Sequence, residues 1–222
     1  MRTLWRQRRV RAVAYVLVAA SALAAVVAAT PWHRPNDNGP LPVLSGAQSV
    51  SHIDPRLSEI ASSFAGRRLQ VRCWSAADWR ARAAEVKRYT PAHIDVHSPW
   101  SGYQTLDHRR ANFGPKVCGR LAALAYGRRG ASSYDDAWWL AWSLGLFAHV
   151  TARSEKRAAG ECHAMQRIGR TGEGFGLTRA EARRLARLFW RDVYPREDSR
   201  YRSNECRPDG KLDLDPANPD WP

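Results

Sequence analysis

The chain has 222 residues and a formal net charge of +14 at pH 7, and five of these charges are arginines that precede residue 12. The remaining +9 is spread along the chain rather than gathered on one segment, which argues against nucleic acid as a partner. A P-loop, a nucleophile elbow, a dinucleotide-binding glycine motif and a Cys-x-x-Cys pair are all missing, so the chemistry of those motifs is not expected.

The amino terminus predicts export. The arginines are followed by an uncharged, alanine-rich run, Ala12–Ala29, and then by Pro31. Hydrocarbon cannot hydrogen-bond free backbone groups, so such a run forms a helix in lipid or the core of a signal peptide. We therefore expect residues 1–11 to be a cytoplasmic basic segment, residues 12–30 a transmembrane anchor or signal peptide, and the remainder extracytoplasmic.

Two outcomes are open for this segment. Its apolar run is longer than the usual signal-peptide core of about 7–15 residues, which favours a retained single-pass anchor in the cell membrane. Val27 and Ala29 are the small residues that cleavage before Thr30 would need, and in that case the protein would be secreted.

Residues 31–53 are rich in proline, glycine, asparagine and serine and predict a flexible linker. The globular domain is expected over residues 54–222, and it begins with a helix capped by Asp54, started by Pro55 and ended by Gly66. The next expected elements are a strand over Leu69–Trp74, a helix from Ser75 to about Lys87, a short hairpin of Tyr103–Leu106 with Arg110–Phe113, and a helix over Pro115–Gly127.

The most apolar segment, Ala137–Val150, predicts a helix that is hydrophobic on all sides and therefore central. A helix over residues 157–170 follows, and the glycines of Gly172–Gly176 predict a connector. The capping box Thr178–Glu181 begins the last helix, which we expect to run to Val193 ahead of an irregular tail. Five or six helices with two to four short strands make a helix-dominated α+β domain.

The four cysteines, Cys73, Cys118, Cys162 and Cys206, all lie beyond the predicted membrane segment. An even number of cysteines in an oxidising compartment predicts two disulfides, for which three connectivities are possible. Pairing in sequence order would close two loops of about 45 residues, each worth about 3–4 kcal/mol in the loop-entropy model.

The segment His93–His97 places His93, Asp95 and His97 at alternate positions. On a strand these side chains would share a face, and two imidazoles with a carboxylate are ligands suited to zinc. The alternative is a surface loop of ordinary polar residues, because no clear strand flanks this segment.

A second candidate group comes from two helices. His149 lies on the apolar helix, and Glu161 lies on the helix that follows. A lone histidine on an apolar helix is usually a hydrogen-bonded core residue. A serine–histidine–aspartate set assembled in space is the alternative, because the members of such a triad need not be close in sequence.

The chain from Cys73 onward resembles a group of exported actinobacterial proteins that look like minimal zinc metallopeptidase (zincin-like) domains. The resembling segments are Val71–Trp74, Gly114–Leu121, the apolar helix, Gly160–Gln166, Phe189–Pro195, Tyr201–Pro216 and Asp220–Pro222. In such relatives the central helix carries His-Glu-x-x-His, which binds zinc and activates water, and the next helix adds an acidic ligand. The resemblance implies one disulfide-stapled zincin-like domain. With the even cysteine spacing, it favours the pairs Cys73–Cys118 and Cys162–Cys206.

The sequence departs from that family at the zinc motif. If His149 matches the second histidine, the first ligand position is Gly145 and the general-base position is Leu146. Glu155 or Glu161 would then supply the third ligand. One imidazole and one carboxylate form neither a tight zinc site nor a base poised on its water. The resemblance therefore implies the fold, the residues argue against the activity, and zinc is disfavoured as a cofactor.

Together these patterns predict a non-catalytic, membrane-anchored, extracytoplasmic domain that binds a protein or polymer of the cell envelope. One alternative is an active metal-dependent hydrolase or peptidase that uses non-standard ligands from either candidate group. Another is a structural or interaction protein with a basic surface, for which binding to anionic lipid or wall polymer would depend on salt.

Overall fold

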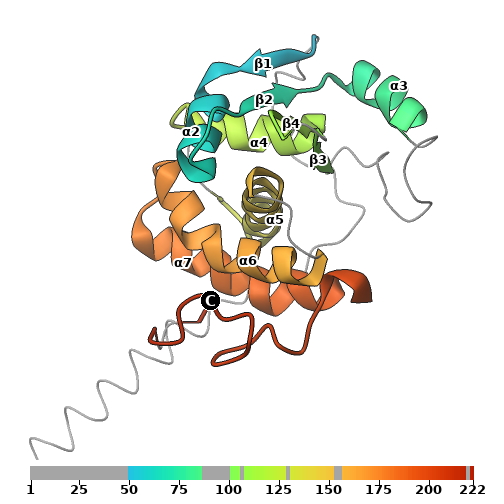
Figure 1. Ribbon diagram of the computed structural model, residues 1–222. Helices are drawn as coiled ribbons and strands as arrows, with labels where there is room; N and C mark the ends of the chain where they lie inside the picture. The colour runs from blue at the N-terminus through green and yellow to red at the C-terminus, as the bar shows by residue number, and fades with distance from the viewer. Residues whose placement is uncertain (1–49, 87–100, 106–107, 129–130, 153–156, 219–220) are drawn as a thin grey trace, which may run out of the picture. The chain divides into compact units, whose positions relative to one another are not determined.

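A small mixed sheet lies on one side of the domain (Figure 1). The computed structural model describes residues 50–86, 101–105, 108–128, 131–152, 157–218 and 221–222, all within the compact unit Pro35–Pro222. The strands are β1 (His52–Asp54), β2 (Gln70–Cys73), β3 (Gly102–Gln104) and β4 (Arg110–Phe113), in the order β1-β2-β4-β3. The central pair, β2 and β4, is parallel, and each outer strand is antiparallel to its neighbour.

Three helices accompany the sheet: α2 (Pro55–Ala65), α3 (Ala76–Val86) and α4 (Pro115–Ala125). As predicted, the Asp54 side chain caps α2 by accepting a hydrogen bond from the Leu57 N–H at 2.9 Å. The helix ends at Gly66, whose φ of 62° lies in the left-handed region that glycine adopts without strain.

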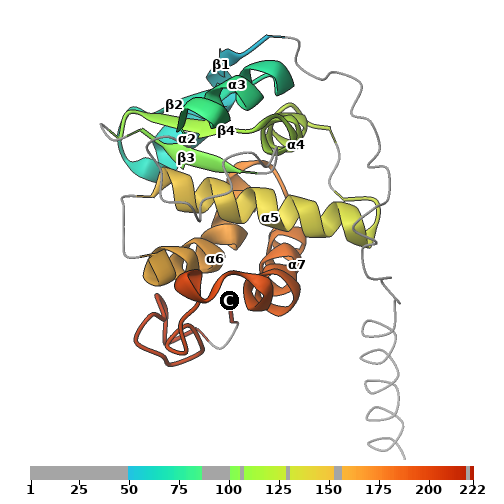
Figure 2. The same cartoon turned by 90° about the vertical axis from the view of Figure 1, so that its right-hand side faces the viewer.

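The apolar helix α5 (Tyr134–Thr151) runs through the middle of the domain, with the sheet on one side and α6 (Arg157–Gly174) and α7 (Arg179–Leu188) on the other (Figure 2). Phe147 of α5 connects the two sides. Its ring stacks on Phe113 of β4 at 5.7 Å between centroids and meets the edge of Phe175 at 5.0 Å. The prediction of a central helix that is hydrophobic all round is confirmed.

The helix α6 is longer than the sequence predicts. It continues to Gly174, so part of the expected connector Gly172–Gly176 is helical. A Cβ atom at Gly172 would lie 3.0 Å from the Cβ of Ala182, and one at Gly174 would lie 2.5 Å from the Phe64 ring. These two glycines therefore permit close packing inside the domain rather than a loop.

The last predicted helix is confirmed in its first part. Thr178 and Glu181 form the expected capping box at the start of α7. The helix does not continue unchanged to Val193: α7 ends at Leu188, and residues Phe189–Val193 form a wider π-helical turn, η1. Two short 3-10 turns follow, η2 (Tyr194–Arg196) and η3 (Ser199–Tyr201).

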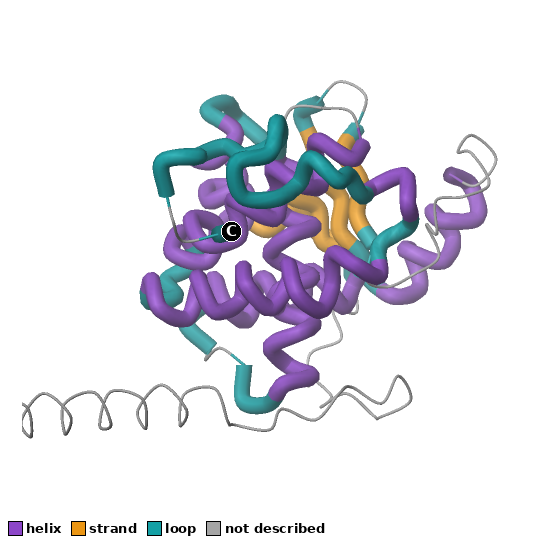
Figure 3. Tube along the Cα trace, turned by 90° about the horizontal axis from the view of Figure 1, so that it is seen from below, coloured by secondary structure: helices purple, strands orange, loops and turns teal. Residues whose placement is uncertain are grey.

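Two disulfides hold the domain, and they join the favoured pairs, Cys73–Cys118 and Cys162–Cys206. The first connects β2 to α4, and the second connects α6 to the C-terminal tail. Gln166 adds two hydrogen bonds to the same tail: its Nε2 donates to the Leu212 carbonyl and its Oε1 accepts from the Leu214 N–H, both at 2.7 Å. Figure 3 shows this loop segment crossing the helices on their outer side.

The helix-dominated α+β class is confirmed for the described residues. Among those residues, no helix combines the length and the apolar character needed to cross a bilayer. The predicted segments 1–11 and 12–30, and the linker up to residue 49, lie outside the described part of the chain. The short strand β1 is not predicted by the sequence pattern, because its three residues are ordered by pairing with β2.

Candidate functional site

At Gly145, where the first zinc ligand is expected, the ring of Phe189 leaves no room for a side chain. Gly145 is buried on α5, and a Cβ atom there would lie 2.5 Å from Cε2 of Phe189. Real Cβ atoms do not approach another carbon so closely, so any larger residue at position 145 would have to displace the Phe189 ring. The face of α5 that would carry the first histidine is therefore in contact with η1.

Two of the predicted site residues do come together. His149 lies on the same face of α5 as Gly145, one turn later, and its Nδ1 is 2.9 Å from Oε2 of Glu161 on α6. The side chains are 31% and 12% exposed, so the pair lies at the edge of the core rather than within it. When the imidazole is protonated, the contact is an ion pair.

A third titratable group, Glu197, joins this pair, and nothing in the sequence pattern singles it out. It follows η2, far along the chain from Glu161. Burial and, next, the negative charge of Glu161 raise the pKa of Glu197 from 4.5 to about 8, while His149 acts in the opposite direction. Near neutral pH this side chain therefore carries a proton for most of the time.

We call His149, Glu161 and Glu197 the His–Glu cluster. Its imidazole and carboxyl groups are of the types that bind zinc. However, its ligand atoms do not form a set lying within 4.8 Å of one another; in the described part of the chain such a set is found only at His52, Asp54 and Cys73. A proton on Glu197 also opposes metal binding, because a ligating carboxylate must be deprotonated.

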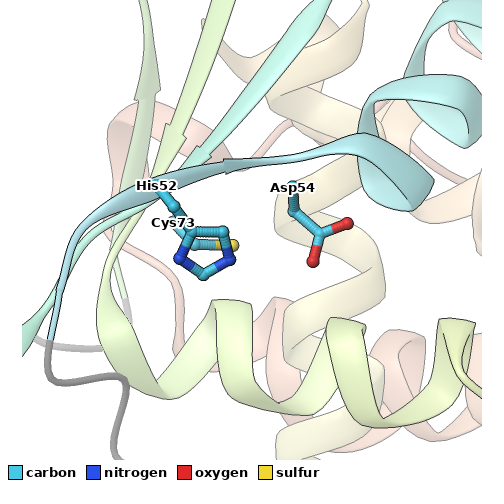
Figure 4. Close-up of side chains that lie close together, drawn as sticks. All are labelled: His52, Asp54 and Cys73. Atoms are coloured by element: carbon cyan, nitrogen blue, oxygen red, sulfur yellow. The ribbon is translucent and has the colours of Figure 1, made fainter.

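The set of His52, Asp54 and Cys73 is structural (Figure 4). The Cys73 sulfur is bonded to Cys118 and cannot act as a thiolate ligand. The Asp54 carboxylate already accepts hydrogen bonds from the Leu57 N–H and, at 3.3 Å, from the Tyr126 hydroxyl. The pairing of β1 with β2 places His52 opposite Cys73, and Asp54 ends β1 as the cap of α2, so strand register and capping account for the proximity of the three side chains.

The other predicted candidates belong to segments outside the described part of the chain. Glu155, the alternative third ligand, lies outside the described residues, and so do His93, Asp95 and His97. The pair of His149 and Glu161 is thus the part of the predicted chemistry that the described residues bring together. Comparisons with protein-family models, with curated proteins and with solved structures found no match.

Proposed function

We propose that this protein is a membrane-anchored, extracytoplasmic binding domain without catalytic activity, built on a degenerate zinc-metallopeptidase-like scaffold. Its partner would be a protein or polymer of the cell envelope. The observation that carries this proposal is the contact of Gly145 with Phe189. His149 has no second imidazole one turn earlier on α5, and Leu146 replaces the glutamate that would activate water.

The two disulfides support the extracytoplasmic location. Stable structural disulfides are typical of oxidising compartments and rare in the cytosol. Both bridges close long loops, with 45 and 44 residues of sequence separation, and both join segments of the hydrophobic core. This arrangement agrees with the predicted anchor followed by a folded exterior domain.

The test is a metal and peptidase assay on the full chain, purified in neutral detergent without reductant. We expect zinc well below one ion per chain and no peptide cleavage that a chelator abolishes. The substitution His149→Gln should alter neither result, because in this proposal His149 holds no metal. Stoichiometric zinc together with chelator-sensitive cleavage, both lost in His149→Gln, would contradict the proposal.

A second candidate function is a hydrolase that uses the His–Glu cluster. It is favoured by the 2.9 Å contact of His149 with Glu161 beside a Glu197 side chain that is protonated near neutral pH. A carboxyl group with a raised pKa, close to an imidazole and a second carboxyl group, is a feature of active sites. In this case Glu161→Gln and Glu197→Gln would each abolish turnover of a hydrolysed substrate, whereas the exposed control Glu59→Gln would not.

A further inference from the structure

Two arginine pairs that are distant in the sequence meet at one end of the sheet. The pair Arg67 and Arg68 lies one residue before β2, which begins at Gln70, while Arg109 directly precedes β4 and Arg110 is its first residue. Because β2 and β4 are parallel with Gln70 opposite Arg110, both pairs come to the same end of the sheet, where these two strands begin. The Gln70 N–H donates to the Arg109 carbonyl at 3.0 Å, which fastens the two segments together.

A pocket of about 600 Å³ opens at this end of the sheet. We call it the arginine pocket, and it is lined by Arg68, Gln70, Thr105, Arg109 and Arg110. Among the residues that the structure describes, this lining has three guanidinium groups, one amide and one hydroxyl, and no carboxylate. Such a lining attracts anions and offers many hydrogen-bond donors.

The wall of the arginine pocket is held by hydrogen bonds within the β3–β4 hairpin. The Arg110 N–H donates to Thr105 Oγ1 at 3.1 Å, and the Thr105 N–H donates to the Arg110 carbonyl at 2.9 Å. Close by, Arg67 donates from Nη1 to the carbonyl of His108. A backbone fixed in this way positions the arginines before any ligand arrives.

Two arginines of the arginine pocket, Arg68 and Arg110, have no described carboxylate that balances their charge. In the described part of the chain no carboxylate forms an ion pair with Arg68 or Arg110, whereas Arg120 and Arg200, for example, have such partners. The Nε of Arg110 is moreover a buried donor for which the described residues provide no acceptor. Buried donors normally have an acceptor, so an anion bound beside Arg110 would supply the acceptor that its Nε lacks.

We propose that the arginine pocket binds a phosphodiester group of an anionic cell-envelope polymer, and the assignment to an envelope polymer rests on the function proposed above. The guanidinium fork matches the oxygens of a phosphate group, and arginines from two segments can approach one tetrahedral group from different sides. Membrane-surface binding would add apolar side chains to the basic ones. The large exposed hydrophobic residues of the described chain, Val50, Ile53, Tyr126 and Leu214, do not line this pocket.

The experiment is a calorimetric titration of the full chain, in neutral detergent, with a synthetic glycerol phosphate oligomer. The test variant is Arg68→Gln with Arg110→Gln, the two pocket arginines without a described carboxylate partner. The control variant is Arg179→Gln with Arg187→Gln, which removes the same charge from exposed positions on α7. We expect each pocket arginine to contribute about tenfold in affinity, as a hydrogen bond to a charged group does, so the test variant should bind about 100-fold more weakly. The control should stay within about threefold of the unchanged chain.

Inorganic phosphate should compete with the oligomer for the unchanged chain, and unfolding curves should show that both double variants are folded. Equal weakening in the two double variants would mean that only net charge matters, and would overturn the proposal. The absence of saturable binding would overturn it too. So would binding to phosphatidylglycerol vesicles that the oligomer cannot displace, since the ligand would then be a membrane surface. These results are separate from the peptidase assay, because zinc-dependent cleavage would contradict the proposed function without changing phosphate binding.

Discussion

The carboxyl groups of Glu161 and Glu197 share one partly buried region beside His149, although they come from α6 and from the segment after η2. Burial is the main reason why the pKa of Glu197 is raised to about 8, and the negative charge of Glu161 adds to it. An acid with a raised pKa keeps its proton in the folded state at a pH where the unfolded chain has released it. The free energy of unfolding of the domain should therefore depend on pH through this residue.

Replacing Glu197 by Gln should flatten that dependence. Because the pKa is raised in the folded state, the stability that protonated Glu197 contributes is complete below pH 4.5 and is lost as the pH rises towards 8. We expect the free energy of unfolding of the unchanged chain to fall between pH 5 and pH 8 by on the order of 3 kcal/mol more than that of Glu197→Gln. Urea unfolding at several pH values measures this difference. Equal slopes for the two proteins would contradict it, and Glu59→Gln, an exposed carboxyl, should behave like the unchanged chain.

Substitution of Gly145 by Ala should destabilise the domain. The new Cβ would lie 2.5 Å from the Phe189 ring, and such overpacking typically costs about 1–3 kcal/mol. The matched control is Gly169→Ala on α6, where no heavy atom lies within 4 Å of the added Cβ. Alanine there should stabilise the helix by about 0.5–1 kcal/mol. Thermal and urea unfolding of both variants test the contrast, and destabilisation of equal size at both positions would show that packing against Phe189 is not the cause.

Removal of the second disulfide should loosen the C-terminal tail. The pair Cys162→Ser with Cys206→Ser opens a loop with 44 residues of sequence separation and should cost about 4 kcal/mol in the loop-entropy model. The hydrogen bonds of Gln166 to Leu212 and Leu214 should then be the main contacts that hold the tail against α6. Adding Gln166→Ala to the serine variant should speed amide exchange of residues 205–214 further. No change in exchange there would contradict the role assigned to Gln166.

The cap of α7 offers a milder test. Thr178→Ala removes the hydroxyl that accepts from the Glu181 N–H, and N-cap losses typically cost about 1 kcal/mol. Thr178→Ser keeps the hydroxyl and should retain most of the stability. Burial is not involved because the pair is exposed, so a large loss in the serine variant would show that the methyl group, and not the cap, matters.

Local patterns were enough for most of the elements. Asp54 with Pro55 predicts the start of α2, and the capping box at Thr178 predicts the start of α7, because a helix N-terminus is decided by residues within one turn. Composition alone likewise identifies α5 as the central helix. The glycines at the end of α6 predict a connector but lie in the helix, because they pack against Phe64 and Ala182, which belong to other elements.

For the candidate sites, too, some features follow from the sequence and others only from the tertiary structure. The sequence alone determined that position 145 carries no zinc ligand and that His149 and Glu161 lie on successive helices, since residue type and helical spacing are local properties. Only the tertiary structure decided that Phe189 occupies the space beside Gly145 and that Glu197 joins the His–Glu cluster. It also decided that two arginine pairs meet at one end of the sheet. The reason is that packing and strand register bring together residues whose separation along the chain leaves no periodic signal in it.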